Sequence, residues 1–556
     1  MRKPNQLNWS ETMKTALKTL LAANILSFIL SLVYAFVPGQ TLYWNVFGIF
    51  LILTLTGNIL ASLPEGHKRR LDIVYLSLSS LGLFAVMLLN TLASSIPTHT
   101  TSISIVSGLF ILALTLTGAL LARSALPPYT RRFSMRGGTY FQTKKSKISR
   151  LFRRTISVLL AAGLLIGLIM AFFMLVPVSI GVAEVILSQY SLFYLLIFSS
   201  TAVLFIKISG FKSGSVLRNG VLILGAALYV AFAVPTVLIP SMLAGAEQSY
   251  TAAFGDIGSD FDDLTAFRQQ PLSLPDYFFG VRTEEYELDE DVLYYAGTEG
   301  VDEGLELRYD VYTPLEEAED LPGERAVLIR IHGGGWNTGG RGFQNVAQFN
   351  KYFASQGYIV FDVEYGLNNK NRLSDLSPVA EEVSGEFSID DMVRHLGIFL
   401  THLADSQDVY GADIDSVFLS GGSAGGHLAN AVALGLTSGA YTDVLDERIN
   451  ISGIIPLYPA NGLAGFQEIT GEEELVDPAL LVDENSPPAL VYHGDTDRIV
   501  SLDVSRKFEQ TYLNNGNTDF ALIQAPYGEH VSDLYFPGYY SQMLVYYMER
   551  FMYEHR

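Results

Sequence analysis

Seven long apolar runs occupy the first half of the chain and limit what it can fold into. As an α-helix rising about 1.5 Å per residue, each run can cross a hydrocarbon core of roughly 30 Å. The first run is too long for the apolar region of a signal peptide, and further runs follow it. The runs lie at about 19–37, 42–63, 71–95, 102–122, 155–177, 186–206 and 219–243. The sequence therefore predicts an N-terminal all-α polytopic membrane domain.

Lys and Arg lie only at alternate ends of these runs, and positive charges beside a span are retained on the cytoplasmic side. The charged ends carry Arg2, Lys3, Lys14 and Lys18; Lys68, Arg69 and Arg70; ten residues from Arg123 to Arg154; and Lys207, Lys212 and Arg218. The other connections, 38–41, 96–101 and 178–185, contain no Lys or Arg. With seven spans we expect a cytoplasmic N-terminus and everything after residue 243 outside. With an even number of spans, the residues after 243 would instead lie in the cytoplasm.

Few ionisable side chains lie within or beside the runs. Glu184 is close to the outer edge of a run and is interpreted as an interfacial residue rather than part of a transport path. Asn24, Asn58 and Asn90 are expected to bridge neighbouring helices. The sequence therefore predicts no chemistry for this half beyond anchoring in the lipid bilayer.

The two halves carry opposite charge. The first 243 residues hold 20 Lys and Arg against 4 Asp and Glu, and the remaining residues hold 16 against 53. The acidic half would repel phosphate groups, so nucleic acid is not expected as a partner. The chain contains no cysteine. This excludes disulfides, thiol nucleophiles and Cys-ligated metal sites.

The composition divides the chain into three expected parts. We expect a membrane domain over 1–244, an extracytoplasmic linker over 245–282 and a C-terminal α/β domain over 283–556. Within the linker, Asp256–Asp263 lacks the closing Glu of a calcium loop, which indicates a solvated turn. Beyond 283, short apolar strands alternate with helical stretches. This pattern predicts a mostly parallel sheet with helices on both faces.

Two glycine-rich turns follow buried strands in the acidic half. The first is His332-Gly333-Gly334-Gly335-Trp336, where backbone N–H groups free of obstructing side chains can hold a developing oxyanion. The second is Gly421-Gly422-Ser423-Ala424-Gly425, a GxSxG sequence between a strand and a helix. This context is typical of a nucleophile elbow, which projects the serine hydroxyl above the sheet. Ser423 is therefore the candidate nucleophile, and the N–H of Ala424 is a candidate oxyanion donor.

A serine nucleophile needs a base, and the base needs an acid that orients it. The strand at 489–492 leads to His493-Gly494-Asp495-Thr496-Asp497, and the strand at 521–523 leads to a loop that contains His530. We expect His530 to be the base. Asp497 is preferred over Asp495 as its partner, because a residue further into the loop can turn back over the sheet. His332, His427 and His493 are expected to be structural.

Together these residues resemble the α/β-hydrolase superfamily, and most closely the bacterial acetyl esterase/lipase group with its feruloyl- and acetylxylan-esterase-like domains. The resemblance covers about 283–556. It implies a triad of Ser423, Asp497 and His530, with oxyanion donors from Gly334, Ala424 and a second glycine, Gly335 or Gly333. The sequence departs from the family at Val363-Glu364-Tyr365-Gly366, where a Tyr-Arg pair is usual, and in lacking a Pro after Val500. No family is recognised for the seven-span half.

The resemblance implies acyl transfer through a serine ester, with no metal or organic cofactor. Trp336, Tyr458 and the insertion at 461–482 are candidates for lining the acyl pocket. The substrate expected is a small ester, or an acylated glycan or lipid, outside the membrane. Two alternatives stay open: a serine peptidase of the prolyl-oligopeptidase type, and a membrane sensor or interaction protein with an inactive hydrolase domain. The sequence does not determine the oligomeric state.

Overall fold

The computed structural model describes most of the chain. The described residues are 11–39, 41–64, 69–126, 147–176, 178–256, 264, 266–283, 285–315, 321–342, 346–370, 379 and 381–556. The expectations for Arg2, Lys3 and Lys68, for the basic residues between 127 and 146, and for nearly all of the Asp256–Asp263 turn lie outside them.

Seven helices in the described part of the first half are long and apolar enough to cross a membrane, as the sequence predicts. Two of the spans are composite, because a π-helical turn interrupts the third and short 3-10 turns precede the sixth. The elements are α1 (Glu11–Phe36), α2 (Leu42–Ala61), α3 (Arg69–Ser77), η1 (Leu78–Gly82), α4 (Leu83–Ser95), α5 (Thr101–Ala125), α6 (Lys147–Leu175), η2 (Gly181–Ile186), η3 (Ser188–Tyr190), α7 (Ser191–Ser209), α8 (Val216–Val237) and α9 (Ile239–Phe254).

Asparagines join spans as expected, with one difference. Asn24 of α1 and Asn58 of α2 exchange two hydrogen bonds of 2.8 Å. Asn90 of α4 accepts a hydrogen bond from Ser107 of α5 at 2.7 Å, and its amide group also donates to Tyr535 Oη in the second half at 3.2 Å. Because unpaired polar groups are costly in an apolar environment, these contacts fix the register of the helices.

The second half contains an eight-stranded sheet with the order β1-β2-β4-β3-β7-β8-β9-β10. β2 pairs antiparallel with β1 and β4, and the remaining pairs are parallel. This is an α/β-hydrolase fold, in agreement with the predicted sheet. The strands are β1 (Tyr286–Ala296), β2 (Glu306–Pro314), β3 (Ala326–Ile331), β4 (Ile359–Val363), β7 (Asp413–Gly422), β8 (Ile451–Leu457), β9 (Ala489–Gly494) and β10 (Phe520–Ala525), with a separate pair, β5 (Leu367–Asn368) and β6 (Ser384–Gly385).

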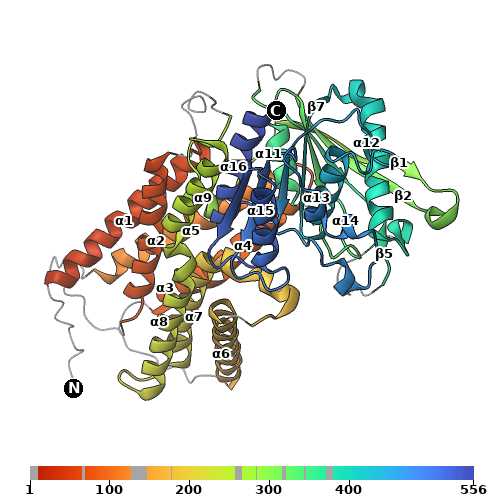
Figure 1. Ribbon diagram of the computed structural model, residues 1–556. Coiled ribbons are helices and arrows are strands. Elements are labelled where there is room, and N and C mark those ends of the chain that lie inside the picture. The colour runs from red at the N-terminus through yellow and green to blue at the C-terminus, as the bar shows by residue number, and fades with distance from the viewer. Residues whose placement is uncertain are drawn as a thin grey trace, which may run out of the picture.

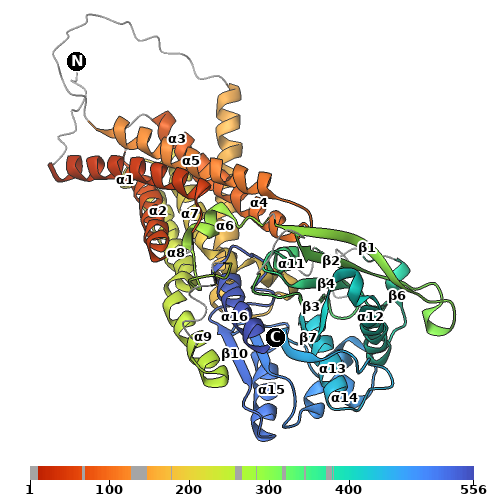
Figure 2. The ribbon, with the colours of Figure 1, turned by 90° about the horizontal axis from the view of Figure 1, so that it is seen from above.

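Helices cover both faces of this sheet. Two core clusters lie on its opposite sides, because alternate residues of a strand point to opposite faces; in β3, Leu328 belongs to one cluster and Val327 and Ile329 to the other. α11 (Ala347–Ala354) and α16 (Tyr539–His555) contribute to the first cluster. α12 (Ile389–Tyr410), α13 (Ala424–Thr437) and α15 (Leu502–Asn514) contribute to the second. Figure 2 shows α11 and α16 between the sheet and the helices of the first half.

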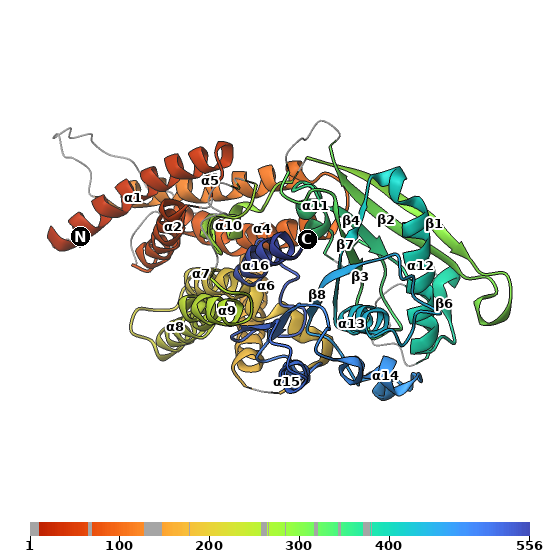
Figure 3. The same ribbon diagram turned by 45° about the horizontal axis from the view of Figure 1, so that its top comes forward.

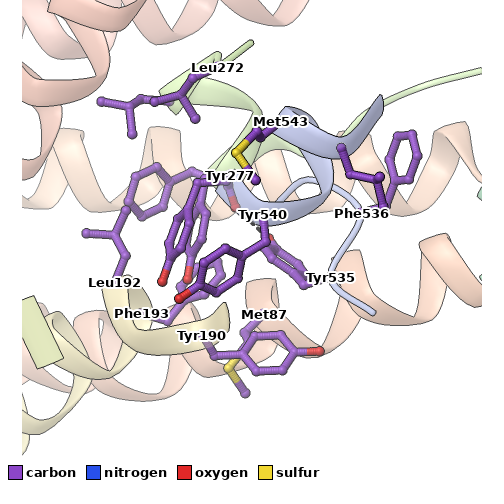
Figure 4. Close-up of a cluster of buried hydrophobic side chains, with 14 of the residues drawn as sticks. Met87, Tyr190, Leu192, Phe193, Leu272, Tyr277, Tyr535, Phe536, Tyr540 and Met543 are labelled. Atoms are coloured by element: carbon purple, nitrogen blue, oxygen red, sulfur yellow. Dashed lines mark hydrogen bonds between the residues drawn. The ribbon is translucent and has the colours of Figure 1, made fainter. Parts of the chain in front are cut away.

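The first core cluster continues without interruption into the membrane half. It includes Met87 of α4, Phe193 of α7 and Tyr277 of α10 (Leu274–Phe279) together with Tyr535 and Met543 of the hydrolase half. Figure 4 shows these side chains packed in one cluster, and Figures 1 and 3 show the two halves side by side along α9, α16 and α4. The spans and the hydrolase therefore share a buried core.

The segment expected to be a linker is largely structured. The last span continues past Pro240 as α9, which ends at Phe254 and contacts β10 and α16. Further along, the side chain of buried Arg268 donates to Gln542 Oε1 at 2.7 Å, and its backbone N–H donates to the Glu549 carboxylate at 3.0 Å. Hydrogen bonds to α16 hold this segment, which explains why its sequence shows no periodicity.

Candidate active site

Ser423 occupies a sharp turn between β7 and α13. Its backbone has φ 56° and ψ −118°, a conformation that is strained for a residue with a side chain. Glycine neighbours make the turn possible, since a Cβ on Gly425 would collide with the carbonyl oxygens of Ile331 and His332 at the end of β3. The Ser423 N–H donates to Leu457 O at 2.9 Å. This geometry is that of a nucleophile elbow at the carboxyl edge of the sheet.

The glycine loop after β3 lies against this elbow. A Cβ on Gly333 would lie 3.4 Å from the Ser423 Cβ and 2.6 Å from Gly422 O. Gly334 and Gly335 have φ of 117° and 61°, and the Gly334 carbonyl accepts hydrogen bonds from the N–H and hydroxyl of Thr338 at 3.0 and 2.9 Å. Ala424 begins α13, where the first N–H groups lack acceptors within the helix. The loop and the helix start can therefore both offer N–H groups beside Ser423.

The structure brings Asp497 and His530 together. Asp497 Oδ2 lies 2.7 Å from His530 Nδ1, and Asp497 Oδ1 accepts from the N–H groups of Ile499 and Val500 at 2.9 and 2.8 Å. Burial opposes ionisation of Asp497, but the nearby rings of His530 and His493 outweigh it and hold its pKa below the usual range. A permanently ionised acid suits the role of orienting an imidazole and stabilising its charged form.

Asp495, the alternative acid, has a different contact. Its Oδ1 accepts from the N–H of Tyr527 at 2.6 Å, so it ties the β9 loop to the β10 loop. His493 Nε2 donates to Val500 O at 2.9 Å, and His493 Nδ1 lies 2.7 Å from Ser505 Oγ. Both residues thus lie in the framework under the Asp497–His530 pair.

Tyr458 lies between the elbow and His530. A Cβ on Gly422 would lie 2.7 Å from Tyr458 Oη, and the Tyr458 ring packs edge-on against the His530 ring with centroids 4.7 Å apart. The Tyr458 hydroxyl donates to Asp533 Oδ1 at 2.7 Å. Burial raises the pKa of Asp533, a residue that the sequence analysis did not single out. Tyr458 is buried and contacts His530, and its expected role in lining the acyl pocket stays a prediction.

Trp336 is also buried, being 2% exposed. Its indole N–H donates to His427 Nδ1 at 3.1 Å, and His427 Nε2 lies 2.8 Å from Leu475 O in the insertion. Burial lowers the pKa of His427 to about 4, so this ring is neutral at pH 7. These contacts link the glycine loop, the elbow helix and the insertion. Among the described residues, no group of three or more His, Asp and Glu is arranged to hold a metal ion.

The segment that departs from the family pattern supports the glycine loop. Tyr365 stacks on the His332 ring with centroids 4.5 Å apart, and its hydroxyl donates to His332 O at 3.0 Å. Burial lowers the pKa of His332 to about 4. Both His332 and Tyr365 therefore have structural contacts in this part of the site.

Comparison with known proteins bears on the second half alone. Residues 309–512 match the family model described as BD-FAE. This part of the chain is similar to that family of α/β-hydrolase esterases. The BD-FAE match includes the glycine loop, Ser423 and Asp497, and ends before His530. The pairing of His530 with Asp497 is therefore an observation of the structure itself.

Curated relatives of the BD-FAE half are described as esterases. The chain is 24% identical over 243 residues to the probable carboxylic ester hydrolase LipM of Mycobacterium tuberculosis. This alignment covers 39% of this chain and 51% of LipM. It is 24% identical over 322 residues to esterase LipQ of the same organism. This second alignment covers 52% of this chain and 70% of LipQ. The chain thus spans about half the length of the first of these relatives. Esterase B of Lactobacillus rhamnosis is similar with a TM-score of 0.36 at 20% identity, covering 47% of this chain and 84% of that chain.

Proposed function

We propose that the chain is a membrane-anchored serine hydrolase of the carboxylesterase, acetyl esterase or lipase type. Ser423 is the nucleophile, His530 the general base and Asp497 its partner. The observation that carries the proposal is the 2.7 Å contact between Asp497 and His530 beside an elbow that bears a serine. The esterase relatives of the BD-FAE half support the same reaction class.

In the proposed reaction, His530 takes the Ser423 proton as the hydroxyl oxygen attacks the ester carbonyl. N–H groups of Ala424 and of the glycine loop at Gly334 and Gly335 stabilise the oxyanion. His530 then protonates the leaving alcohol, and water attacks the acyl-serine to release the acid. No step requires a metal or an organic cofactor.

The proposed topology has the N-terminus in the cytoplasm and the hydrolase outside. Contacts between the two halves support it, because they involve connections that lack Lys and Arg. Lys351 of α11 donates to Ile96 O at 2.8 Å, and the Tyr286 hydroxyl donates to Pro97 O at 2.9 Å. Residues 178–190 contact the loops after β9 and β10. We keep the division into 1–244, 245–282 and 283–556 as a proposal for the domain limits.

The test is hydrolysis of nitrophenyl acetate and butyrate by the full chain in detergent or nanodiscs, beside the Ser423→Ala variant. We expect turnover by the wild type and its loss in the variant. Aminoacyl nitroanilides, assayed in parallel, test the prolyl-oligopeptidase type of reaction. Failure of Ser423 to react with a fluorophosphonate probe in the folded protein would favour an inactive sensor. The substrate in the cell is proposed only as a small ester or an acylated glycan or lipid outside the membrane.

A further inference from the structure

Residues 178–190, here termed the connector, lie between the membrane spans α6 and α7 and against the edge of the sheet that holds Ser423. The connector includes η2 and η3. Three of its side chains, Glu184, Ser188 and Gln189, are at most 1% exposed, although they lie at the end of a span. Their partners are backbone and side-chain groups of the two hydrolase loops that carry Asp497 and His530.

The connector binds the acid loop directly after Asp497. Glu184 Oε1 accepts a hydrogen bond from the backbone N–H of Arg498 at 3.1 Å. The Arg498 guanidinium reaches further and donates to Val176 O, near the end of α6, at 3.2 Å. Both contacts begin at the residue next to the acid, so they restrain the direction in which the Asp497 side chain leaves the backbone.

The connector binds the base loop on both sides of His530. Glu529 Oε2 accepts from the backbone N–H of Ser188 at 3.1 Å and from the Ser188 hydroxyl. On the other side, Gln189 Nε2 donates to Val531 O at 3.2 Å, and Gln189 Oε1 accepts from the N–H of Tyr535 at 2.8 Å. The aromatic rings of Tyr190 and Tyr535, both drawn in Figure 4, pack with centroids 5.1 Å apart.

We infer that Glu184, Ser188 and Gln189 are positioning residues for the proposed triad, so that the membrane half completes the active site instead of only anchoring it. Asp497 and His530 follow different strands, β9 and β10, and the connector holds both loops. The inference rests on the proposed function. It assigns the Asp497–His530 distance to hydrogen bonds made by a segment outside the hydrolase half.

The expected effect is on turnover rather than on substrate binding. The connector side chains touch the backbone of the two loops, and a shift of about 1 Å in a catalytic group can cost about 100-fold in rate. We therefore expect connector variants to lower kcat about 10- to 100-fold with KM changed less than about 3-fold. A role limited to stability would lower the amount of folded protein and leave kcat per folded molecule unchanged.

The decisive comparison is Glu184→Leu against Glu184→Gln in the full chain in nanodiscs. Glutamine keeps an Oε1 acceptor for the Arg498 N–H, whereas leucine removes it at similar volume. Ser188→Ala tests the second loop separately. Its matched control is Ser200→Ala, which removes a buried hydroxyl of α7 that contacts Ser79 at 2.7 Å within the bundle. For each variant, kcat and KM on nitrophenyl butyrate are normalised to folded protein measured by thermal unfolding and size exclusion.

Loss of kcat in Glu184→Leu and Ser188→Ala, with recovery in Glu184→Gln and wild-type turnover in Ser200→Ala, would support the inference. If Glu184→Leu does not fold, Ser188→Ala decides. An active wild type with folded connector variants of unchanged kcat, or with a change in KM alone, would overturn this inference and leave the proposed function standing. A folded wild type that neither hydrolyses the ester nor reacts with a fluorophosphonate at Ser423 would overturn both.

Discussion

Ser188, at the start of the sixth span, donates buried hydrogen bonds to the carboxylate of Glu529 in the hydrolase half. Glu529 directly precedes His530 in the chain. Glu529 is 1% exposed, and burial raises its pKa to about 8, although the Ser188 hydrogen bonds favour the carboxylate. A protonated carboxyl at neutral pH therefore lies where the two halves meet, next to the proposed base.

Stability should depend on the protonation of Glu529. Its pKa in the unfolded chain is near 4.5, so between about pH 4.5 and 8 the folded state holds a proton that the unfolded state has released. The unfolding free energy should fall as pH rises through this range. Glu529→Gln has no such proton, so its unfolding temperature relative to the wild type should increase between pH 5 and pH 8. A difference that stays constant with pH would contradict the prediction.

Asp497→Asn should remove the charged partner of His530 and lower kcat by about 10³- to 10⁴-fold. Asp495→Asn is the matched control, because asparagine keeps the oxygen that accepts from the Tyr527 N–H and leaves the His530 contact intact. We expect less than about 3-fold change in this control. Steady-state hydrolysis of nitrophenyl butyrate measures both, and equal losses in the two variants would mean that Asp497 has no special role.

Tyr458→Phe should destabilise the protein by about 1–3 kcal/mol, because it leaves the buried Asp533 carboxyl without the tyrosine hydroxyl. The ring that packs on His530 is retained. The loss in kcat, expressed as a free energy, should therefore be smaller than the loss in unfolding free energy. Tyr441→Phe removes a solvent-exposed hydrogen bond to Glu472 of 2.8 Å and should be nearly neutral. Denaturation midpoints of the two variants in the same detergent provide the comparison.

The hydrolase half should not stay soluble and monomeric when it is separated from the membrane half. A piece comprising residues 281–556 would expose the part of the first core cluster that packs on the spans, including Phe349, Tyr535 and Met543. We expect this piece to aggregate or to need detergent, as large exposed apolar patches do. Size exclusion at several concentrations tests this, and a monodisperse and fully active piece would show that the shared core is dispensable.

The proposed topology can be tested with single cysteines, because the chain has none of its own. Val409→Cys lies at an exposed site of the hydrolase half, where Val409 is 75% exposed, and Lys212→Cys lies between α7 and α8. In intact cells, a membrane-impermeant maleimide should label the first, and should label the second only after permeabilisation. The opposite pattern would place the hydrolase in the cytoplasm.

Much of the architecture follows from patterns in the sequence. The long, nearly uncharged runs predicted seven helices that could cross a membrane, and the strand and helix periods of the second half predicted a mostly parallel sheet with helices on both faces. The described residues contain seven such helices and such a sheet. The motifs around Ser423, Asp497 and His530 pointed to residues that the fold places at one edge of the sheet. Such patterns are local, so a single sequence reveals them.

Other features depend on contacts between distant segments. From the sequence, Glu184 was expected to be interfacial, yet it is buried and accepts a hydrogen bond from Arg498. Residues 245–282 were expected to be a linker, yet Arg268 forms hydrogen bonds with α16. Glu184 is the single acidic residue between Asp72 and Glu247, a signal that could have marked it. Tyr458 and Trp336 are buried, Tyr458 against His530 and Trp336 against His427, and whether they line a pocket stays a prediction.

The sequence by itself determined which segments are apolar enough to enter a bilayer, which form strands, and which residues are candidates for acyl transfer, because hydrophobic period, glycine turns and charge act over short stretches of chain. Only the tertiary structure decided that the spans and the sheet share a core, and that Ser188 and Glu184 hold the loops of His530 and Asp497. Those partners lie more than 300 residues apart. Their contact follows from close packing and from the need of buried polar groups for hydrogen bonds, which no local pattern records.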